Sequence, residues 1–269
     1  MANHSDIPEI VFDDSYLPIA IKTFIFFLVA SFTVTPLISW YSCLTYRDIS
    51  SYQKYDWNTR VLSCVHAVFA SALGFYNLLF DQPTWEDPVW GTSYLTRATI
   101  AITTGYISSD LVIILYAFPL KDSVFYIVHH LAVVLAYLAN MVYGPLTFFA
   151  NARVIAEFST PCVNFRWMLQ LTGFKESKTY LYNGFAMLGS FFLVRVGIIP
   201  LYYYILFKTF FVEGGINRLP IWMTAVCFVA SLALDSVNVY WFVKMARGAY
   251  KMLRKPSNSD PARTRIKGE

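Results

Sequence analysis

Two adjacent histidines, His129 and His130, are the residues of this chain with the clearest capacity for chemistry. They lie within a long apolar stretch. An imidazole titrates near neutral pH, so it can transfer protons or act as a nucleophile in acyl transfer. Neighbouring residues on an α-helix point about 100° apart. We therefore expect one of the two histidines to face a functional site while the other contacts a neighbouring helix.

Other polar side chains interrupt the apolar stretches and complete the candidate site. A charge at the centre of a membrane helix costs on the order of 2.5–3.5 kcal/mol, so five such charges facing lipid would cost roughly 12–18 kcal/mol. Three acids and two arginines nearly cancel, which predicts that they face one another or water inside the protein. The candidate catalytic residues are His129, His130 and Glu157. The candidate cavity-lining residues are His66, Asp110, Asn140, Arg153, Asn164, Arg195, Asp235 and Asn238.

The spacing of these residues places several of them on common helix faces. Arg153, Glu157 and Asn164, spaced by four and seven residues, form one stripe along a helix, and Asp235 shares a face with Asn238. Such stripes would converge on a polar cavity that extends from the bilayer centre toward the cytosol. The alternative is a structural role, in which Arg153 and Glu157 form an ion pair within one helix and the asparagines join helices.

The elements that must position these residues are membrane-spanning helices. Hydrophobic residues make up 57% of the 269 residues and charged residues 14%, and the mean hydropathy is +0.47, whereas a soluble domain carries about 25% charged residues. A hydrocarbon core of about 30 Å requires roughly 20 helical residues per span. The sequence predicts an all-α, multi-pass membrane protein with seven transmembrane helices at residues 17–43, 61–80, 98–118, 124–143, 146–167, 180–207 and 219–245.

The distribution of basic residues predicts the orientation of the chain. With the N-terminus outside the cytosol, thirteen Lys and Arg residues fall in cytosolic loops and the C-terminal tail, against three in the opposite loops. This bias is typical of a lumenal N-terminus and a cytosolic C-terminus. Residues 1–16 are predicted to form an acidic non-cytosolic tail and residues 17–44 the first transmembrane helix. Residues 255–269 are predicted to be a disordered, basic cytosolic tail that attracts anionic lipid headgroups.

The sequence around the histidine pair resembles a known family. Residues 128–167, VHHLAVVLAYLANMVYGPLTFFANARVIAEFSTPCVNFRW, resemble the TLC domain, named for TRAM, Lag1 and CLN proteins. The resemblance extends from WNTRVLSCVH at 57–66 through SSDLVIILY at 108–116 to LDSVNVYW at 234–241. It implies a TLC domain over residues 52–254, residence in the endoplasmic reticulum, and a role in lipid synthesis, sensing or trafficking. It also implies that six of the helices form a bundle around a central cavity.

Ceramide synthases, the best-known enzymes of this family, transfer a fatty acyl group from coenzyme A to a sphingoid amine. The resemblance implies that they use a tandem His and an acidic motif, His-Asp-x-Ser-Asp, on the next helix. His129 and His130 match the tandem pair, but the chain reads AEFST at 156–160. Glu157 keeps one carboxylate, whereas Ala156 and Thr160 replace the motif's His and second Asp. The loss of these two polar partners argues against acyl transfer by the same mechanism.

We therefore expect a protein of lipid homeostasis that binds or senses an acyl lipid in an intramembrane cavity, without a cofactor or a metal. The alternative is an acyltransferase, in which His129 is the nucleophile or base, Glu157 orients it, and acyl-CoA is a substrate. A seven-helix receptor or transporter is disfavoured because the polar residues cluster toward the cytosolic half. The net charge of +4 arises from loops and the tail, so no nucleic-acid partner is expected. The sequence does not predict an oligomeric state.

Overall fold

The computed structural model of the protein describes residues 10–117 and 119–254. Within these residues all regular secondary structure is helical, which confirms the predicted all-α class. The predicted tail 255–269 and residues 1–9 of the predicted tail 1–16 lie outside the described residues. The α-helices are α1 (Leu17–Phe32), α2 (Val34–Ser42), α3 (Leu44–Asp48), α4 (Ser51–Phe80), α5 (Gln82–Glu86), α6 (Tyr94–Ala117), α7 (Leu120–Tyr143), α8 (Thr147–Val154), α9 (Thr160–Leu171), α10 (Lys178–Phe191), α11 (Ile199–Phe207) and α12 (Ile221–Leu253).

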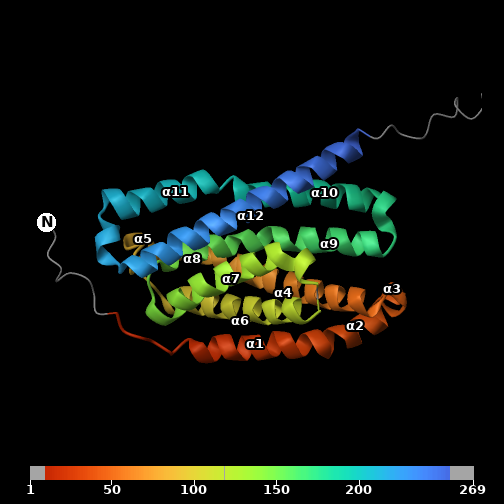
Figure 1. Ribbon diagram of the computed structural model, residues 1–269, viewed down its shortest axis with the longest axis horizontal. Helices are drawn as coiled ribbons and strands as arrows, with labels where there is room; N and C mark the ends of the chain where they lie inside the picture. The colour runs from red at the N-terminus through yellow and green to blue at the C-terminus, as the bar shows by residue number, and fades with distance from the viewer. Residues whose placement is uncertain (1–9, 118, 255–269) are drawn as a thin grey trace, which may run out of the picture.

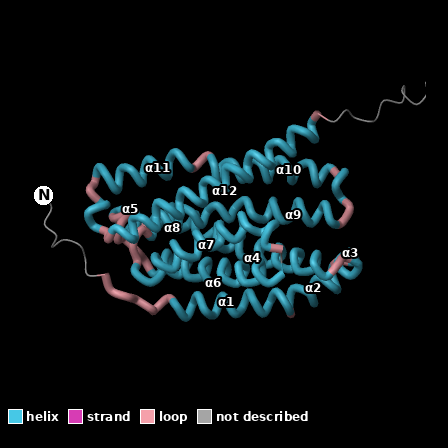
Figure 2. Tube along the Cα trace, viewed as in Figure 1, coloured by secondary structure: helices cyan, strands magenta, loops and turns pink. Residues whose placement is uncertain are grey.

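Six helical segments among the described residues are long and apolar enough to cross a membrane. They comprise Leu17–Ser42, Ser51–Phe80, Tyr94–Ala117, Ser123–Tyr143, Lys178–Val212 and Ile221–Met252. The predicted span 146–167 is not among them, because it forms two short helices, α8 and α9, instead of one apolar helix. The two helices nevertheless lie end to end and together run the length of the bundle (Figure 1). Figure 2 shows most of the loops at the two ends of the bundle, while a short non-helical stretch between α10 and α11 lies part-way along it.

Helix α6 lies at the centre of the bundle. About 72% of its most apolar window is buried inside the protein, against 22% for the segment Leu17–Ser42, which holds α1 and α2. Its small residues allow close packing: a Cβ atom added to Gly105 would lie 2.3 Å from the carbonyl oxygen of Ala20, so the backbones of α1 and α6 are nearly in contact there. Small residues at helix interfaces are typical of membrane bundles. The Thr103 and Thr104 hydroxyls donate to backbone carbonyls one turn earlier and so need no water.

Two local signals set the ends of the helices that position the site. Helix α4 begins ten residues before the predicted apolar span, because Ser50 and Gln53 cap it reciprocally: each side chain accepts a hydrogen bond from the other residue's backbone N–H. Helix α7 ends at Tyr143 because Gly144 adopts a left-handed conformation, with φ of 83°. The Gly144 N–H then donates to the Asn140 carbonyl at 2.7 Å.

Ion pairs neutralise the basic residues at the end of the bundle that holds α5 and the start of α1. Arg97 pairs with Asp13 at 2.5 Å, Arg218 with Asp87 at 2.6 Å, and Lys208 with Glu213 at 3.2 Å. Arg97 also donates to the Met141 carbonyl at 2.5 Å, which ties the chain before α1 to the end of α7. Burial opposes ionisation of Asp87, but hydrogen bonds from Arg218 and from two backbone N–H groups outweigh it and lower its pKa.

The Asp13 carboxylate gives a pH-dependent prediction. Hydrogen bonds from Ser15, and then from Arg97, lower the pKa of Asp13 from 3.8 to about 2. A lowered pKa in the folded state stabilises the fold above the unfolded value, and the contribution is lost as the pH falls through the folded value. We expect Asp13→Asn to lower the melting temperature in detergent at neutral pH, and the difference from wild type to shrink as the pH falls from about 4 to about 2.

The neighbouring exposed acid serves as the control for this measurement. Asp14 makes no ion pair among the described residues, so Asp14→Asn should leave the melting temperature nearly unchanged. A deficit of Asp13→Asn that stayed constant over the acidic range would contradict the assignment.

Candidate functional site

A proline divides the pass that carries Arg153, Glu157 and Asn164 into two helices, α8 and α9. Pro161 has no backbone N–H, so it cannot donate to the Glu157 carbonyl four residues earlier, as a continuous helix would require. The chain tightens into a 3₁₀ turn at Ile155–Ser159, and the Thr160 N–H donates to the Glu157 carbonyl instead. The turn changes the angular spacing of the side chains. It therefore separates Glu157 from the face that carries Arg153.

A second irregular turn places Arg195 next to the 3₁₀ turn at Ile155–Ser159. The residues Phe192–Val196 form a π-helical turn between α10 and α11, in which the Gly197 N–H donates to the Phe192 carbonyl at 2.6 Å. Pro200 in the first turn of α11 has no N–H for the Val196 carbonyl, so an uninterrupted α-helix cannot pass this point. Turns of this kind occur frequently at functional sites.

Arg195 joins the two irregular turns through its hydrogen bonds. Its Nε donates to the Ala156 carbonyl at 3.1 Å and to the Ser159 hydroxyl at 2.9 Å. One terminal nitrogen donates to the Asn238 amide oxygen at 3.2 Å, and the other to the Thr160 hydroxyl at 3.1 Å. The Thr160 hydroxyl in turn donates to the Glu157 carboxylate at 2.8 Å. The Arg195 and Glu157 charges are thus linked through one hydroxyl.

Arg153 has a different partner from the one predicted within its own helix. Its two terminal nitrogens donate to the two carboxylate oxygens of Asp235 on α12, at 2.5 and 2.9 Å. Its guanidinium carbon also lies 3.7 Å from the centre of the Tyr202 ring. The predicted Arg153–Glu157 ion pair is therefore wrong. The 3₁₀ turn between the two residues is the reason, because it directs Arg153 toward α12 and leaves Glu157 beside Thr160.

The two histidines point to different surroundings. His130 lies between two acceptors: its Nε2 is 2.9 Å from the Asp110 carboxylate on α6, and its Nδ1 is 2.7 Å from the Tyr126 carbonyl. A carbonyl only accepts, so Nδ1 carries a proton. The His129 ring lies 5.4 Å from the Trp241 ring, and its Nδ1 is buried without a partner among the described residues. His130 is thus held by two hydrogen bonds, whereas His129 is not.

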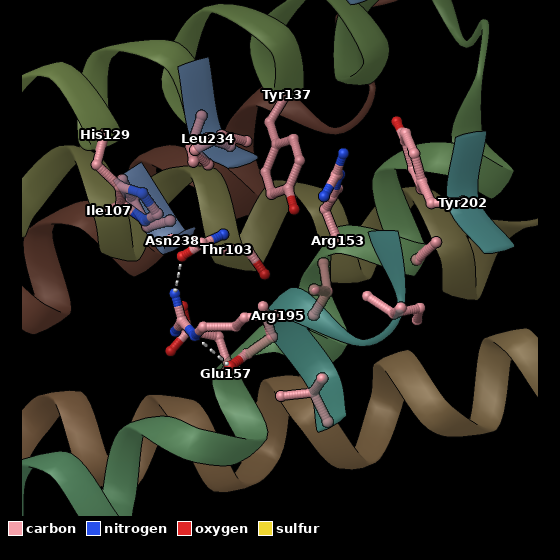
Figure 3. A pocket seen from close by; sticks show the side chains of 16 residues that line it. Thr103, Ile107, His129, Tyr137, Arg153, Glu157, Arg195, Tyr202, Leu234 and Asn238 are labelled. Carbon is pink, nitrogen blue, oxygen red and sulfur yellow. Dashed lines mark hydrogen bonds between the residues drawn. The ribbon is translucent and has the colours of Figure 1, made fainter. Parts of the chain in front are cut away.

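His129 lines an interior cavity (Figure 3). The cavity encloses about 560 Å³ of empty space, including the part open to the outside. It is narrow, with room for about two water molecules. Five passes supply its walls, while α1 and α4 contribute no residue to the lining that the structure describes, although the resemblance implies six helices around the cavity. The lining residues are Thr103, Ile107, His129, Val133, Tyr137, Ala152, Arg153, Val154, Ala156, Glu157, Val194, Arg195, Ile198, Tyr202, Leu234 and Asn238.

Five of the candidate residues line this cavity: His129, Arg153, Glu157, Arg195 and Asn238. The structure places the other candidates elsewhere. Asn140 lines a second cavity nearby. His130, Asp110 and Asp235 lie behind the walls as hydrogen-bond partners.

His66 and Asn164, in the part of the chain that the structure describes, line neither of these two cavities. The His66 ring stacks on the Tyr106 ring at 3.8 Å, and neither ring nitrogen has a partner among the described residues. Helix α4 packs against α8 and the 3₁₀ turn, which keeps His66 away from the cavity. Asn164 accepts from Arg60 at 3.0 Å, because α9 begins a new helix after the break and its side chains no longer continue the stripe.

Sequence reasoning missed the two tyrosines of the cavity wall. Tyr202 lies under Arg153, and its hydroxyl is 3.0 Å from the Ser231 hydroxyl. The Tyr137 hydroxyl donates to the Ala150 carbonyl at 3.2 Å. Their sequence carries no signal for this role. As for a metal site, the described residues contain no group of three or more His, Cys, Asp or Glu residues arranged to hold an ion.

The Arg153–Asp235 pair gives a second prediction. Its side chains are only 11% and 10% exposed, so removing one partner leaves the other charge buried and unpaired. We expect Arg153→Met to reduce the free energy of unfolding by about 3–5 kcal/mol, and Arg153→Met with Asp235→Leu to recover most of the loss. Denaturation of the purified variants in mixed micelles measures both effects as a double-mutant cycle.

An exposed ion pair provides the matched control. Lys208 and Glu213 are 55% and 46% exposed, so Lys208→Met should cost at most about 1 kcal/mol. A single Arg153 variant that is as stable as wild type would show that Asp235 finds another partner.

Comparison with known proteins agrees with the fold and with the histidine-bearing block. A profile of the TLC domain of TRAM, LAG1 and CLN8 proteins matches residues 56–247. The chain is 36% identical to TLC domain-containing protein 4-B of Xenopus laevis, over 94% of each chain. It is 34% identical to TLC domain-containing protein 4 of Homo sapiens, over 77% of this chain and 79% of the relative. It is 28% identical to Protein CLN8 of Canis lupus familiaris, over 68% of this chain and 66% of the relative. The chain is therefore an integral, multi-pass membrane protein of the TLC domain family.

Proposed function

We propose that the protein serves lipid homeostasis by binding an acyl lipid in the cavity that His129 lines. The observation that carries the proposal is the contrast between the walls of this cavity. Ile107, Val133 and Leu234 offer an apolar surface for methylene groups, and Arg195 and Glu157 offer polar groups for a lipid headgroup or carboxyl. Ligand sites combine a largely apolar wall with a few convergent polar groups in this way.

The narrowness of the cavity bears on how a lipid is accommodated. The space holds about two water molecules, so an acyl chain fits only after lining side chains move apart. Binding therefore selects a wider conformation than the one described, and lipid affinity is reduced by the free energy of reaching it. The family's association with lipid synthesis, sensing and trafficking, which the sequence resemblance implies, supports a lipid as the occupant.

The proposed orientation in the endoplasmic reticulum membrane has a lumenal N-terminus and a cytosolic C-terminus. Each of the three basic residues near the N-terminal end is paired with an acid, so this end carries little unbalanced positive charge. The opposite end holds the basic residues of α12, of which Lys244, Arg247 and Lys251 lie in the described part. Such residues attract anionic lipid headgroups with about 1 kcal/mol each.

Lipid analysis of the purified protein tests the proposed function. We expect mass spectrometry to find an acyl lipid enriched over the bulk extract, and Val194→Trp to reduce the enrichment, because Val194 lines the cavity and the indole would fill it. The control is Leu193→Trp, since Leu193 is 67% exposed on the outside of the same turn. The absence of an enriched lipid from the wild-type protein in several mild detergents would refute the proposal.

An acyltransferase is the second candidate, because an imidazole and a carboxylate line one cavity. Against it, the Glu157 carboxylate already accepts a hydrogen bond from the Thr160 hydroxyl, and no described side chain orients the His129 ring through Nδ1. A nucleophilic or basic histidine normally has such an orienting partner.

We accordingly expect no product when the reconstituted protein is given labelled acyl-CoA with a panel of amines and lysophospholipids. The measurement compares wild type with His129→Ala against empty vesicles. Product from wild type that disappears in His129→Ala would replace the binding proposal with acyl transfer.

A further inference from the structure

A second cavity lies beside the first, between α7, α8, α11 and α12. It encloses about 540 Å³ of empty space, including its open part, and its walls are mainly apolar. None of the candidate residues except Asn140 and Arg153 contributes to its lining among the residues that the structure describes. The lining residues are Ala136, Tyr137, Ala139, Asn140, Pro145, Leu146, Phe149, Ala150, Arg153, Tyr202, Met223, Val226, Cys227, Ala230, Ser231 and Leu234.

Aromatic contacts join α7 and α12 on either side of this cavity along the helices. The Tyr143 and Trp222 rings lie 5.5 Å apart. The Phe125 and Tyr240 rings stack at 4.7 Å, on α7 well before its lining residues. Between these contacts both helices contribute alanines to the cavity lining, and small side chains leave space that larger ones would fill.

The lining residues of α7 and α12 lie close to the lipid-facing surface of the bundle. Leu138 on α7 and Val229 on α12 lie next to lining residues in the sequence, and they are 41% and 68% exposed on the outside of the bundle. Both helices belong to segments that are apolar enough to span the membrane. Large apolar side chains exposed on such segments contact lipid. A ligand that reached the cavity from this surface would therefore be an acyl chain in preference to a polar solute.

A wall of four residues separates the two cavities: Tyr137, Arg153, Tyr202 and Leu234 line both of them. Arg153 is fixed by Asp235 and lies over the Tyr202 ring. Both tyrosine hydroxyls are also hydrogen-bonded. Figure 3 shows Tyr137, Arg153 and Tyr202 in a row at the end of the first cavity away from His129. The wall is therefore held by several contacts at once.

We propose that the second cavity binds one acyl chain of a bilayer lipid, which enters between α7 and α12, and that the wall keeps this chain away from His129. This proposal extends the proposed function and rests on it, because the proposed function places a lipid in the first cavity, on the other side of the wall. Asn140 lines this cavity; its amide nitrogen donates to the Pro145 carbonyl and the Thr147 hydroxyl, and its buried Oδ1 has no partner in the described structure.

Photocrosslinking with a lipid of defined composition tests the site. The protein is reconstituted in phosphatidylcholine vesicles in which one acyl chain ends in a diazirine, and adducts are mapped by peptide mass spectrometry. We expect adducts on the lining stretches 136–140 and 223–231. Ala139→Trp should reduce them about tenfold, because Ala139 lines the cavity and the indole would fill it. Leu138→Trp, on the lipid-facing side of the same helix, should leave them unchanged. Ala136→Phe replaces Ala139→Trp if the latter does not fold.

Removal of the wall provides the second arm of the experiment. Tyr202→Ala should raise the adducts on Ile107 and Val133 about tenfold over wild type by opening the wall, while Tyr202→Phe, which keeps the ring, should not.

Adducts confined to lipid-facing residues and insensitive to Ala139→Trp would overturn the second site. Adducts on Ile107 and Val133 that stay at the wild-type level in Tyr202→Ala would overturn the wall. Failure of the proposed function is read separately, from the absence of co-purified lipid in the Val194 experiment. The acyl-chain site can therefore fail while the proposed function stands, and the reverse also holds.

Discussion

A charge removed from water must find its partner inside the protein, and this constraint organises the interior of the bundle. Each acid among the candidate residues has a basic or imidazole partner, and each partnership joins different passes of the chain. The partnerships are Arg153 with Asp235, His130 with Asp110, and Arg195 with Glu157 through the Thr160 hydroxyl. Together they fix the positions of the cavity walls. His129 is left without such a partner, and it is the histidine that faces the cavity.

The all-α architecture and most of the spans could be predicted from hydropathy, because the bilayer imposes long apolar helices on the sequence. Hydropathy located the end of α7 at Tyr143, but it placed the start of α4 at residue 61 instead of Ser51. The first turns of α4 contain few apolar residues, and the Ser50 cap stabilises them. A hydropathy window does not detect such a cap. The pass formed by α8 and α9 was predicted as one helix, although Pro161 already carried the signal for its break.

The membership of the candidate site could be predicted better than its pairing. The cost of burying charge identified Arg153, Glu157 and Arg195, which the structure brings to one cavity. The partners depended on helix faces, and the prediction assumed a regular period of 3.6 residues through residues 153–164. The 3₁₀ turn alters that period, so Arg153 reached Asp235 in place of Glu157. Tyr202 owes its role to tertiary contacts alone, and no pattern in one sequence reports those.

The two irregular turns also divide neighbouring passes at the same depth. The 3₁₀ turn separates α8 from α9, the π-helical turn separates α10 from α11, and Arg195 bonds one turn to the other. Bends in membrane helices concentrate at such interruptions. The half-helices α8 and α11 can consequently pivot together about this junction while α9 and α10 stay in place. A hinge in this position would change the width of both cavities, and the Arg153–Asp235 pair would limit the movement because it ties α8 to α12.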